Sequence, residues 1–177
     1  VQGKPLVTPD GLFVGSSDGC VYRLDPGNGR PLWKAPYCTD APIHGVLAYQ
    51  DGFLFFTVAI NKLYVLKARD ATFLYEHHRD RPQFMSSEGV SSPALAGPNV
   101  LVGYSDGFLV AIDRFHGTEV WTTDLSGKSR TSPDVDTTPV VDGGTIYASS
   151  FGAGPSAVRA KDGVVLWDGR EAASEEL

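Results

Sequence analysis

Cysteine and methionine are scarce in this sequence, which holds two cysteines and one methionine among 177 residues. Two cysteines are too few for a disulfide framework, and their spacing is not that of zinc ligands. Two unpaired thiols at Cys20 and Cys38 are favoured over a single bridge between them, and both alternatives stay open.

Long apolar runs and basic runs are also missing. The longest apolar run, Phe53 to Ile60, is interrupted by Thr57, whereas a membrane-spanning helix needs about 18 consecutive apolar residues. The formal net charge is -6. Because a nucleic-acid-binding protein needs a basic face to neutralise phosphates, nucleic acid is not an expected partner.

A sustained 3.6-residue apolar period is absent, which disfavours amphipathic helices. The chain instead carries twenty glycines and twelve prolines, and its short apolar runs are separated by pairs such as Asp10-Gly11, Asp18-Gly19 and Asp106-Gly107. Asp-Gly between apolar runs favours two-residue hairpin turns, because these turns need positive φ. The sequence therefore predicts an all-β protein with many short strands.

An internal repeat organises these strands. Trp33, Tyr75, Trp121 and Trp167 lie 42, 46 and 46 residues apart, which is the length of a four-stranded propeller blade. We expect a single, partial β-propeller domain over residues 1–177, with an outer strand at Pro31–Lys34 in the first blade. The four antiparallel blades are expected at approximately 4–35, 43–76, 90–122 and 136–168, followed by a tail at 169–177.

The end of each repeat has a common pattern. In the clearest copy it reads Ala111-x-Asp113-x-x-x-Gly117-x-x-x-Trp121. A large ring can close one blade against the next, glycine permits the tight loop, and a short carboxylate can bond loop amides. The other copies keep part of this pattern. The first has Asp25, Gly29 and Trp33 but Arg23 in place of the alanine, and the fourth has Ala157, Gly163 and Trp167 but Arg159 in place of the aspartate. The second copy is degenerate, with Lys67, Ala71 and Tyr75.

This pattern resembles the tryptophan-docking motif of PQQ-like β-propeller repeats, which is structural and does not imply a bound quinone. The run Asp134-Val135-Asp136-Thr137-Thr138-Pro139-Val140-Val141 is similar to one in the family of the outer-membrane protein assembly factor BamB, and Ser91-Ser92-Pro93 has the same relative place in the preceding unit. The resemblance implies a periplasmic, outer-membrane-associated lipoprotein with an eight-bladed ring that scaffolds the β-barrel assembly machine. The four blades here would be about half of that ring.

The resemblance also implies partner-binding residues. In the family the two aspartates of this run contact periplasmic domains of the barrel-assembling partner, which assigns this role to Asp134 and Asp136. A second family contact corresponds to Met85-Ser86-Ser87-Glu88, so Met85 and Glu88 are the other candidates, although the family's arginine is missing there. Both stretches join an outer strand to the next inner strand and are expected on one rim. Alternatively, the aspartates cap the backbone amides of Thr137 and Thr138, a role that does not exclude contact with a partner.

Other chemistry is not expected. Gly15–Gly19 matches Gly-x-Ser-x-Gly, yet a strand rather than a helix follows it, and Gly103–Gly107 repeats it as a hairpin turn would. His77-His78 with Asp80 has no third ligand spaced to join it. The aspartates of the Asp134 run lack the further ligands of a calcium loop. We therefore assign no catalytic, cofactor-binding or metal residue.

The expected function is that of a non-enzymatic scaffold. The alternatives are part of a PQQ- and calcium-dependent quinoprotein dehydrogenase, and a generic extracellular PQQ-repeat binding protein. Four blades alone would leave two blade faces uncovered. If each face exposes about 500 Å² of apolar surface, it loses roughly 12 kcal/mol of the stabilisation that burial would give. We therefore expect the ring to be completed by further blades of a longer chain, with a second copy or tight closure of the four blades as alternatives.

Overall fold

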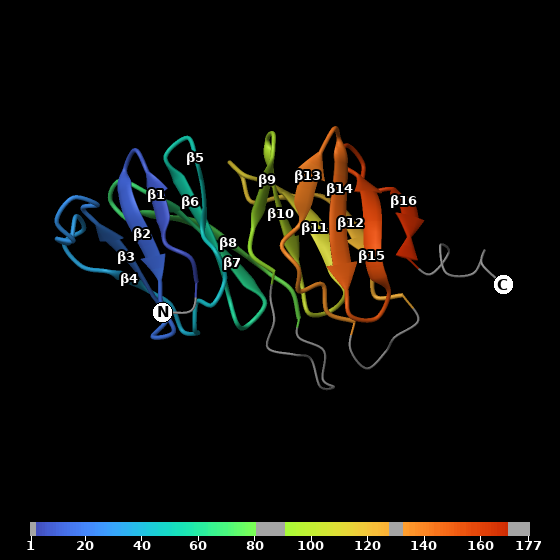
Figure 1. Cartoon of the computed structure of the whole chain (residues 1–177), viewed down its shortest axis with the longest axis horizontal. Helices are drawn as coiled ribbons and strands as arrows, with labels where there is room; N and C mark the ends of the chain where they lie inside the picture. Colours follow the sequence, from blue (N-terminus) through green and yellow to red (C-terminus); the bar gives the residue numbers. More distant parts are fainter. Residues whose placement is uncertain (1–2, 81–90, 128–132, 170–177) are drawn as a thin grey trace. The chain divides into compact units, whose positions relative to one another are not determined.

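The computed structural model describes residues 3–80, 91–127 and 133–169 (Figure 1). Within them, every named element is a β-strand, and the strands form four sheets of four strands each. No helix in this part of the chain is long and apolar enough to cross a membrane. The expected all-β class with four-stranded antiparallel blades is confirmed. The chain forms two compact units, Val1–His78 and Arg79–Leu177.

The first unit contains two sheets in which each strand pairs with the next strand along the chain. In the second sheet Asp51-Gly52 makes the first turn, and both residues have the positive φ that such a turn needs, 52° and 80°. In the first sheet the turn residues are Pro9 and Asp10, because Gly11 already pairs with Thr8 as the first residue of the second strand. The strands are β1 (Leu6–Thr8), β2 (Gly11–Gly15), β3 (Cys20–Leu24) and β4 (Tyr37–Cys38), then β5 (Ala48–Gln50), β6 (Phe53–Val58), β7 (Lys62–Lys67) and β8 (Phe73–His78).

The second unit repeats this arrangement. Its strands are β9 (Ala94–Ala96), β10 (Asn99–Gly103), β11 (Phe108–Asp113) and β12 (Glu119–Asp124), then β13 (Val140–Asp142), β14 (Thr145–Ser150), β15 (Gly154–Arg159) and β16 (Val165–Asp168). A register shift recurs between the third strand and the outer strand, at Ala111/Ile112 in one sheet and Ala157/Val158 in the other. The same shift lies at Val65/Leu66 in the first unit. The sequence repeat thus corresponds to a repeated backbone structure, including the register shift before the outer strand.

The outer strand of the first sheet differs from the expected one. Instead of a strand at Pro31–Lys34, Pro31 makes an isolated bridge with Leu24, and the chain pairs again only at β4. Trp33 in this interval points into the core, where it is 7% exposed. Pro31 and Pro36 lack the N–H that a continuous ladder needs, which explains the interruption.

The two cysteines are joined by a disulfide in the first unit. Cys20 in β3 lies directly opposite Cys38 in β4, and the bond between them closes a segment of sequence separation 18. The favoured alternative of two unpaired thiols is therefore wrong. An outer strand at Pro31–Lys34 would not place Cys38 opposite Cys20, whereas the observed strand β4 does.

Removing this disulfide is expected to destabilise the protein. In the chain-entropy model, a closed loop of this length contributes about 3 kcal/mol to the free energy of unfolding. Replacing both cysteines with serine should lower that free energy by about this amount, and dithiothreitol should lower it similarly in the unaltered protein but not in the variant. Urea unfolding of both proteins measures this, and equal stabilities would contradict the expectation.

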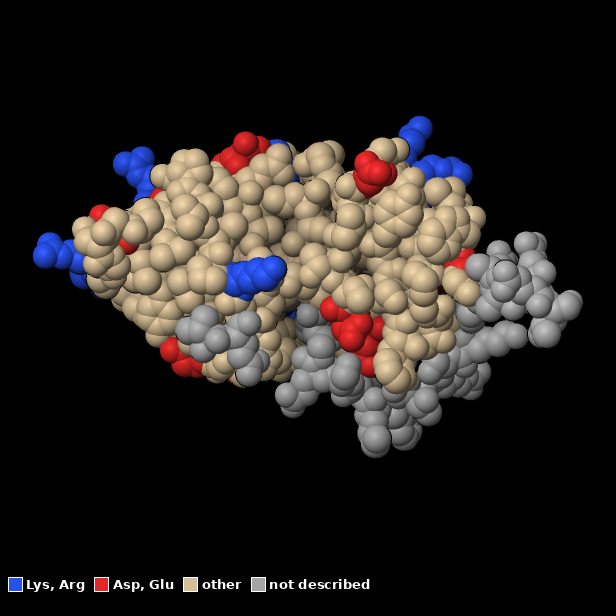
Figure 2. All heavy atoms as spheres, viewed as in Figure 1, with Lys and Arg blue, Asp and Glu red and all other residues tan. Residues whose placement is uncertain are grey.

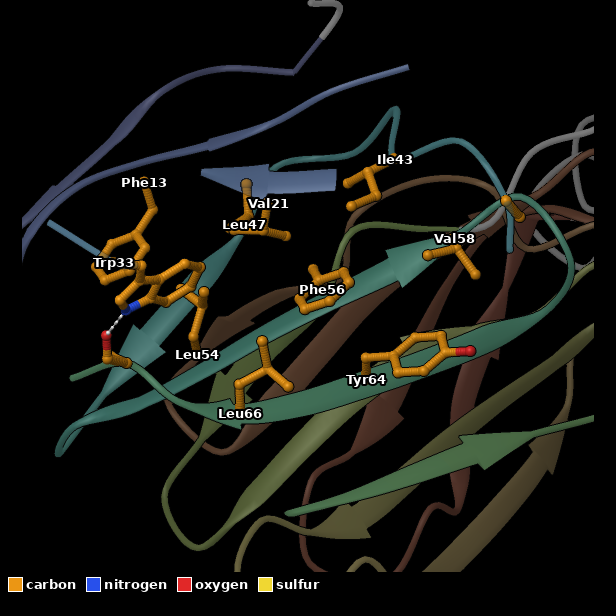
Figure 3. Close-up of a cluster of buried hydrophobic side chains, with 12 residues drawn as sticks. Phe13, Val21, Trp33, Ile43, Leu47, Leu54, Phe56, Val58, Tyr64 and Leu66 are labelled. Carbon is orange, nitrogen blue, oxygen red and sulfur yellow. Dashed lines mark hydrogen bonds between the residues drawn. The ribbon is translucent and has the colours of Figure 1, made fainter. Parts of the chain in front are cut away.

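Each unit has its own apolar core between its two sheets. Figure 3 shows the first, where side chains of the first sheet and of the β4–β5 connection meet those of β6 and β7. Its members include Phe13, Trp33, Leu54, Phe56, Tyr64 and Leu66. The second core is formed by Leu101, Leu109, Ala111, Leu125, Val135, Ile146, Ala148 and Val158. Burial of this alternating apolar face holds each pair of blades together.

Candidate partner-binding rim

Two of the tryptophans that end the repeats, Trp33 and Trp121, fasten neighbouring blades. In the first unit the Trp33 Nε1–H donates to the Ala68 carbonyl, 3.1 Å away, as the dashed line in Figure 3 shows. In the second unit Trp121 Nε1 makes the equivalent bond to the Ala160 carbonyl, also at 3.1 Å. Both acceptors directly follow the third strand of the next blade. These residues are therefore architectural, as the motif indicates.

The loop before Trp33, Tyr75, Trp121 and Trp167 has one geometry in all four repeats. In each loop, the residue four positions after the motif's aspartate has a φ between 60° and 74°. Its backbone N–H donates to the backbone carbonyl of the residue at the aspartate position. The donors and acceptors are Gly29 and Asp25, Ala71 and Lys67, Gly117 and Asp113, and Gly163 and Arg159. The Asp113 carboxylate also accepts from the backbone N–H of His116 at 2.8 Å, which lowers the pKa of that carboxyl. Glycine and aspartate thus favour the loop, and the degenerate copies form it without the aspartate.

Two other repeat residues complete the predicted set. Tyr75 lies in β8 and is half-buried, and Trp167 lies in β16 and is 44% exposed. The Trp167 ring packs against Tyr147 with centroids 6.3 Å apart.

The Asp134 run belongs to the connection between β12 and β13, and three backbone hydrogen bonds hold this connection, one at its start and two in the run itself. Leu125 N donates to the Gly107 carbonyl at 2.8 Å, and Val135 N donates to the Tyr104 carbonyl at 3.1 Å. From the other side, Phe151 N donates to the Asp134 carbonyl at 3.0 Å. The run is therefore held between the β10–β11 turn and the β14–β15 turn.

The first unit has the same three bonds in its β4–β5 connection. Thr39 N donates to Gly19 O at 2.9 Å, Ile43 N to Ser16 O at 3.1 Å, and Ala59 N to Pro42 O at 3.1 Å. Pro42 thus occupies the position of Asp134. This backbone bond therefore forms with either residue at that position.

The two predicted aspartates lie in different environments. Asp134 is 1% exposed, whereas Asp136, two residues later, is exposed. Val135 between them is fully buried and lies so close to Gly103 that a Cβ on that glycine would be 2.5 Å from the Val135 carbonyl. The buried valine fixes the run, and of the two carboxylates it leaves that of Asp136 accessible to a partner.

Hydroxyl groups hold the starts of both inner strands of the second unit. Thr137 Oγ1 donates to the Ser149 carbonyl at 3.1 Å and accepts from Ser149 N at 2.8 Å. One blade earlier, Ser91 Oγ accepts from Gly103 N at 2.7 Å. The similarity of the two Ser/Thr-Ser/Thr-Pro stretches in the sequence therefore has a structural cause.

The connection that contains Met85 and Glu88 lies partly outside the described residues, and both of these candidates fall there. Its described ends attach to the β10–β11 hairpin: Arg79 Nε donates to the Asp106 carboxylate, and Ser91 N donates to the Gly103 carbonyl at 3.2 Å. The Arg79 guanidinium also lies 4.4 Å from the centroid of the Phe108 ring. One hairpin thus anchors both connections that carry predicted partner residues.

The motifs rejected for catalysis and metal binding lie on ordinary structural elements. Gly19 N donates to Ser16 O and Gly107 N to Tyr104 O, both at 3.1 Å, and each turn joins two strands. His77 and His78 are the last two residues of strand β8, where successive side chains point to opposite faces. Among the described residues, no group of three or more potential metal ligands is found.

Two features of the rim have no simple signal in the sequence. Arg79 pairs with a carboxylate 27 residues away, and such a distant pair leaves no spacing to detect. Phe151 is a large apolar residue of a type that is usually buried, yet it is 78% exposed. On the face that Figure 2 shows, acidic and basic side chains form small separate groups among uncharged ones.

Comparison with known proteins gives consistent results. A family model described as "Outer membrane protein assembly factor BamB" matches residues 1–176. The BamB of Yersinia pestis is 27% identical over 172 residues, covering 94% of this chain and 43% of that protein. The chain thus spans less than half the length of this curated relative.

Solved structures show the same fold. The crystal structure of BamB from Moraxella catarrhalis matches with a TM-score of 0.81 and 21% identity, covering 94% of this chain and 52% of that one. A quinohemoprotein alcohol dehydrogenase from Pseudomonas putida HK5 matches with a TM-score of 0.72 and 15% identity, covering 94% and 33%. At these identities the likeness is one of fold.

Proposed function

The chain belongs to the family of the outer membrane protein assembly factor BamB, and on this premise we propose that it acts as a non-enzymatic scaffold in the assembly of β-barrel proteins into the outer membrane. It presents a rim of loops to a protein partner, the periplasmic domains of the barrel-assembly machinery. The observation that carries the proposal is the exposed Asp136 on a backbone that is fixed on both sides.

The two aspartates have separate roles in this proposal. Asp136 makes the contact, because its carboxylate is exposed, and Asp134 positions the run from within the protein, because it is buried. Met85 and Glu88 are proposed as the second contact on the same rim.

The disulfide supports a periplasmic location. Disulfides form and persist in oxidising compartments, including the bacterial periplasm, and are rare in the cytosol. The Cys20–Cys38 bond joins adjacent strands of a blade and is therefore part of the fold. We propose that the protein acts in the periplasm at the outer membrane, as the BamB resemblance implies.

Reversing the charge at Asp136 tests the function. Asp136→Lys in the intact protein should weaken binding to the purified periplasmic domains of the barrel-assembly partner at least tenfold, because like charges across an interface are costly. Asp142→Lys is the matched control, since Asp142 is also exposed and lies at the other end of β13. It should change the dissociation constant less than twofold.

Calorimetric titration of both variants measures these constants, and thermal unfolding checks that both are folded. Unchanged binding by Asp136→Lys, or equal losses in the two variants, would contradict the assignment of the rim. No binding by the unaltered protein would contradict the proposed function itself.

A further inference from the structure

The outer strand of the first blade is shorter than its three counterparts. β4 has two residues, whereas β8 and β12 have six each and β16 has four. Only β4 is tied to its neighbouring strand by a covalent bond, the Cys20–Cys38 disulfide, because the chain has no other cysteines. The shortest of the four outer pairings is therefore the one that carries a cross-link.

The segment that contains β4 is held at both ends without the disulfide. Before β4, the Trp33 Nε1–H is bonded to the Ala68 carbonyl of the second blade. After β4, Ile43 N donates to Ser16 O at 3.1 Å, and the Ile43 side chain is fully buried. Residues 34–42, which we call the β4 span, therefore lie between two anchored points. Such a segment can open while the structure around it stays folded.

Few contacts join the β4 span to β3. The ladder consists of the two residues of β4 and their partners in β3, and one of these pairs is the two cysteines. After the ladder, the Thr39 N–H and hydroxyl both donate to the Gly19 carbonyl, at 2.9 and 3.0 Å. Before the ladder, a hollow of about 160 Å³ is lined by the end of β3 and by residues 33–36. The ladder is not continued there, so the disulfide supplies a large part of the attachment.

The β4 span also contacts the second blade. The Tyr37 ring centroid lies 6.4 Å from those of both Phe56 and Tyr64. Asp40 Oδ2 lies 3.7 Å from Lys62 Nζ, and the Asp40 side chain is 61% exposed. Because an exposed ion pair contributes little to stability, this side of the span is held mainly by the Tyr37 ring.

The two cysteines differ in accessibility, which sets the course of a reduction. Cys38 is exposed, whereas Cys20 is 9% exposed. A thiolate of a dithiol that attacks Cys38 Sγ forms a mixed disulfide there and expels the Cys20 thiolate, which takes a proton from water. The second thiol of the reductant then displaces Cys38. The protein gains two thiols, and the dithiol, which supplied both electrons, becomes a disulfide.

We propose that the Cys20–Cys38 disulfide is a redox-sensitive clamp on the outer strand of the first blade. A dithiol reductant cleaves it in the folded protein, and the β4 span then opens while the rest of the first unit stays folded. Opening uncovers Val21, which is fully buried in the closed form, and separates Asp40 from Lys62. The clamp does not depend on the proposed function.

The kinetics of reduction test whether the folded protein is attacked. Without denaturant, the rate of reduction by dithiothreitol should rise in proportion to its concentration, because the attack on Cys38 is direct. Trapping of the thiols with an alkylating reagent followed by mass spectrometry measures this rate. A rate that levels off at the rate of global unfolding would show that only the unfolded chain is reduced, and would overturn the clamp.

Amide hydrogen exchange tests whether the opening is local. After reduction, the Thr39 amide should exchange at least tenfold faster. The amides of Ile43 and of its counterpart in the second unit, Val135, whose N–H donates to Tyr104 O, should stay within twofold. NMR of the oxidised and reduced proteins measures these rates.

The double variant Cys20→Ser/Cys38→Ser is the control for the reductant. Its Thr39 amide should exchange as fast as in the reduced protein, with or without dithiothreitol. Unchanged exchange at Thr39 after reduction would show that the other contacts suffice to hold the strand. Equal acceleration at Thr39 and Ile43 would show that the disulfide stabilises the first unit as a whole. Either result would overturn the clamp and leave the proposed function untouched.

Discussion

Replacing Trp33 with alanine is expected to lower the free energy of unfolding by about 3–5 kcal/mol, the usual cost of truncating a buried aromatic residue. The Trp33 ring is 7% exposed and packs against Phe13 with centroids 5.6 Å apart. Its Nε1–H also satisfies the Ala68 carbonyl of the next blade. The variant loses both the packing and the bond, at the point where one blade is fastened to its neighbour.

Two further variants identify the cause of this loss. Trp33→Phe keeps an aromatic ring but lacks the Nε1–H donor. It should lower the free energy of unfolding by less than half as much as Trp33→Ala does. Leu32→Ala removes a neighbouring side chain that is 43% exposed and should cost no more than about 1 kcal/mol. Urea unfolding measures all three, and a Trp33→Ala protein as stable as Leu32→Ala would refute the fastening role.

Gly163→Ala is expected to destabilise the second unit by about 2–5 kcal/mol, from two independent causes. Gly163 has a φ of 74°, which L-residues adopt only with strain of about 1–2 kcal/mol. A Cβ there would also lie 2.6 Å from Trp121 Cε3 and 2.7 Å from Thr123 Oγ1. The Thr123 hydroxyl already donates to the Gly163 carbonyl at 2.6 Å, so neither group can withdraw without breaking a contact.

Gly29→Ala separates the two causes. Gly29 holds the same loop position with a φ of 71°, but a Cβ there would meet nothing within 4 Å. It should therefore show the strain alone, about 1–2 kcal/mol. Thermal unfolding measures the loss of stability in each variant. Equal losses in Gly163→Ala and Gly29→Ala would mean that the close contact with Trp121 adds nothing to the strain.

The spacing of the tryptophans predicts most of this fold because each blade is a local unit of about 45 residues. Each strand pairs with the next one along the chain, so hairpin turns such as Asp106-Gly107 set the register without distant information. The loop geometry at Gly117 follows for the same reason. Even Ala71, which departs from the motif, adopts the positive φ that its three counterparts have.

The features that the sequence did not predict depend on non-local packing. The Cys20–Cys38 pairing needed the true outer strand, which the inward turn of Trp33 between two prolines displaces. The different environments of Asp134 and Asp136 follow from the burial of Val135 against the β10–β11 turn. No spacing between residues encodes such a contact.

The two units provide an internal control for assigning function. Backbone bonds of the same kind hold Pro42 in one and Asp134 in the other, and likewise Ala59 and Phe151. Of the two aspartates of the second unit, only Asp136 is exposed, so the contact with a partner is proposed there.

Site-specific photo-crosslinking in living cells tests the central claim most directly. A photo-reactive amino acid at position 136 of the intact protein should give a covalent adduct with the barrel-assembly partner, because Asp136 is exposed on the proposed contact rim. The same group at position 142, at the other end of β13, should give none. An adduct from position 142 but not from position 136 would contradict the account.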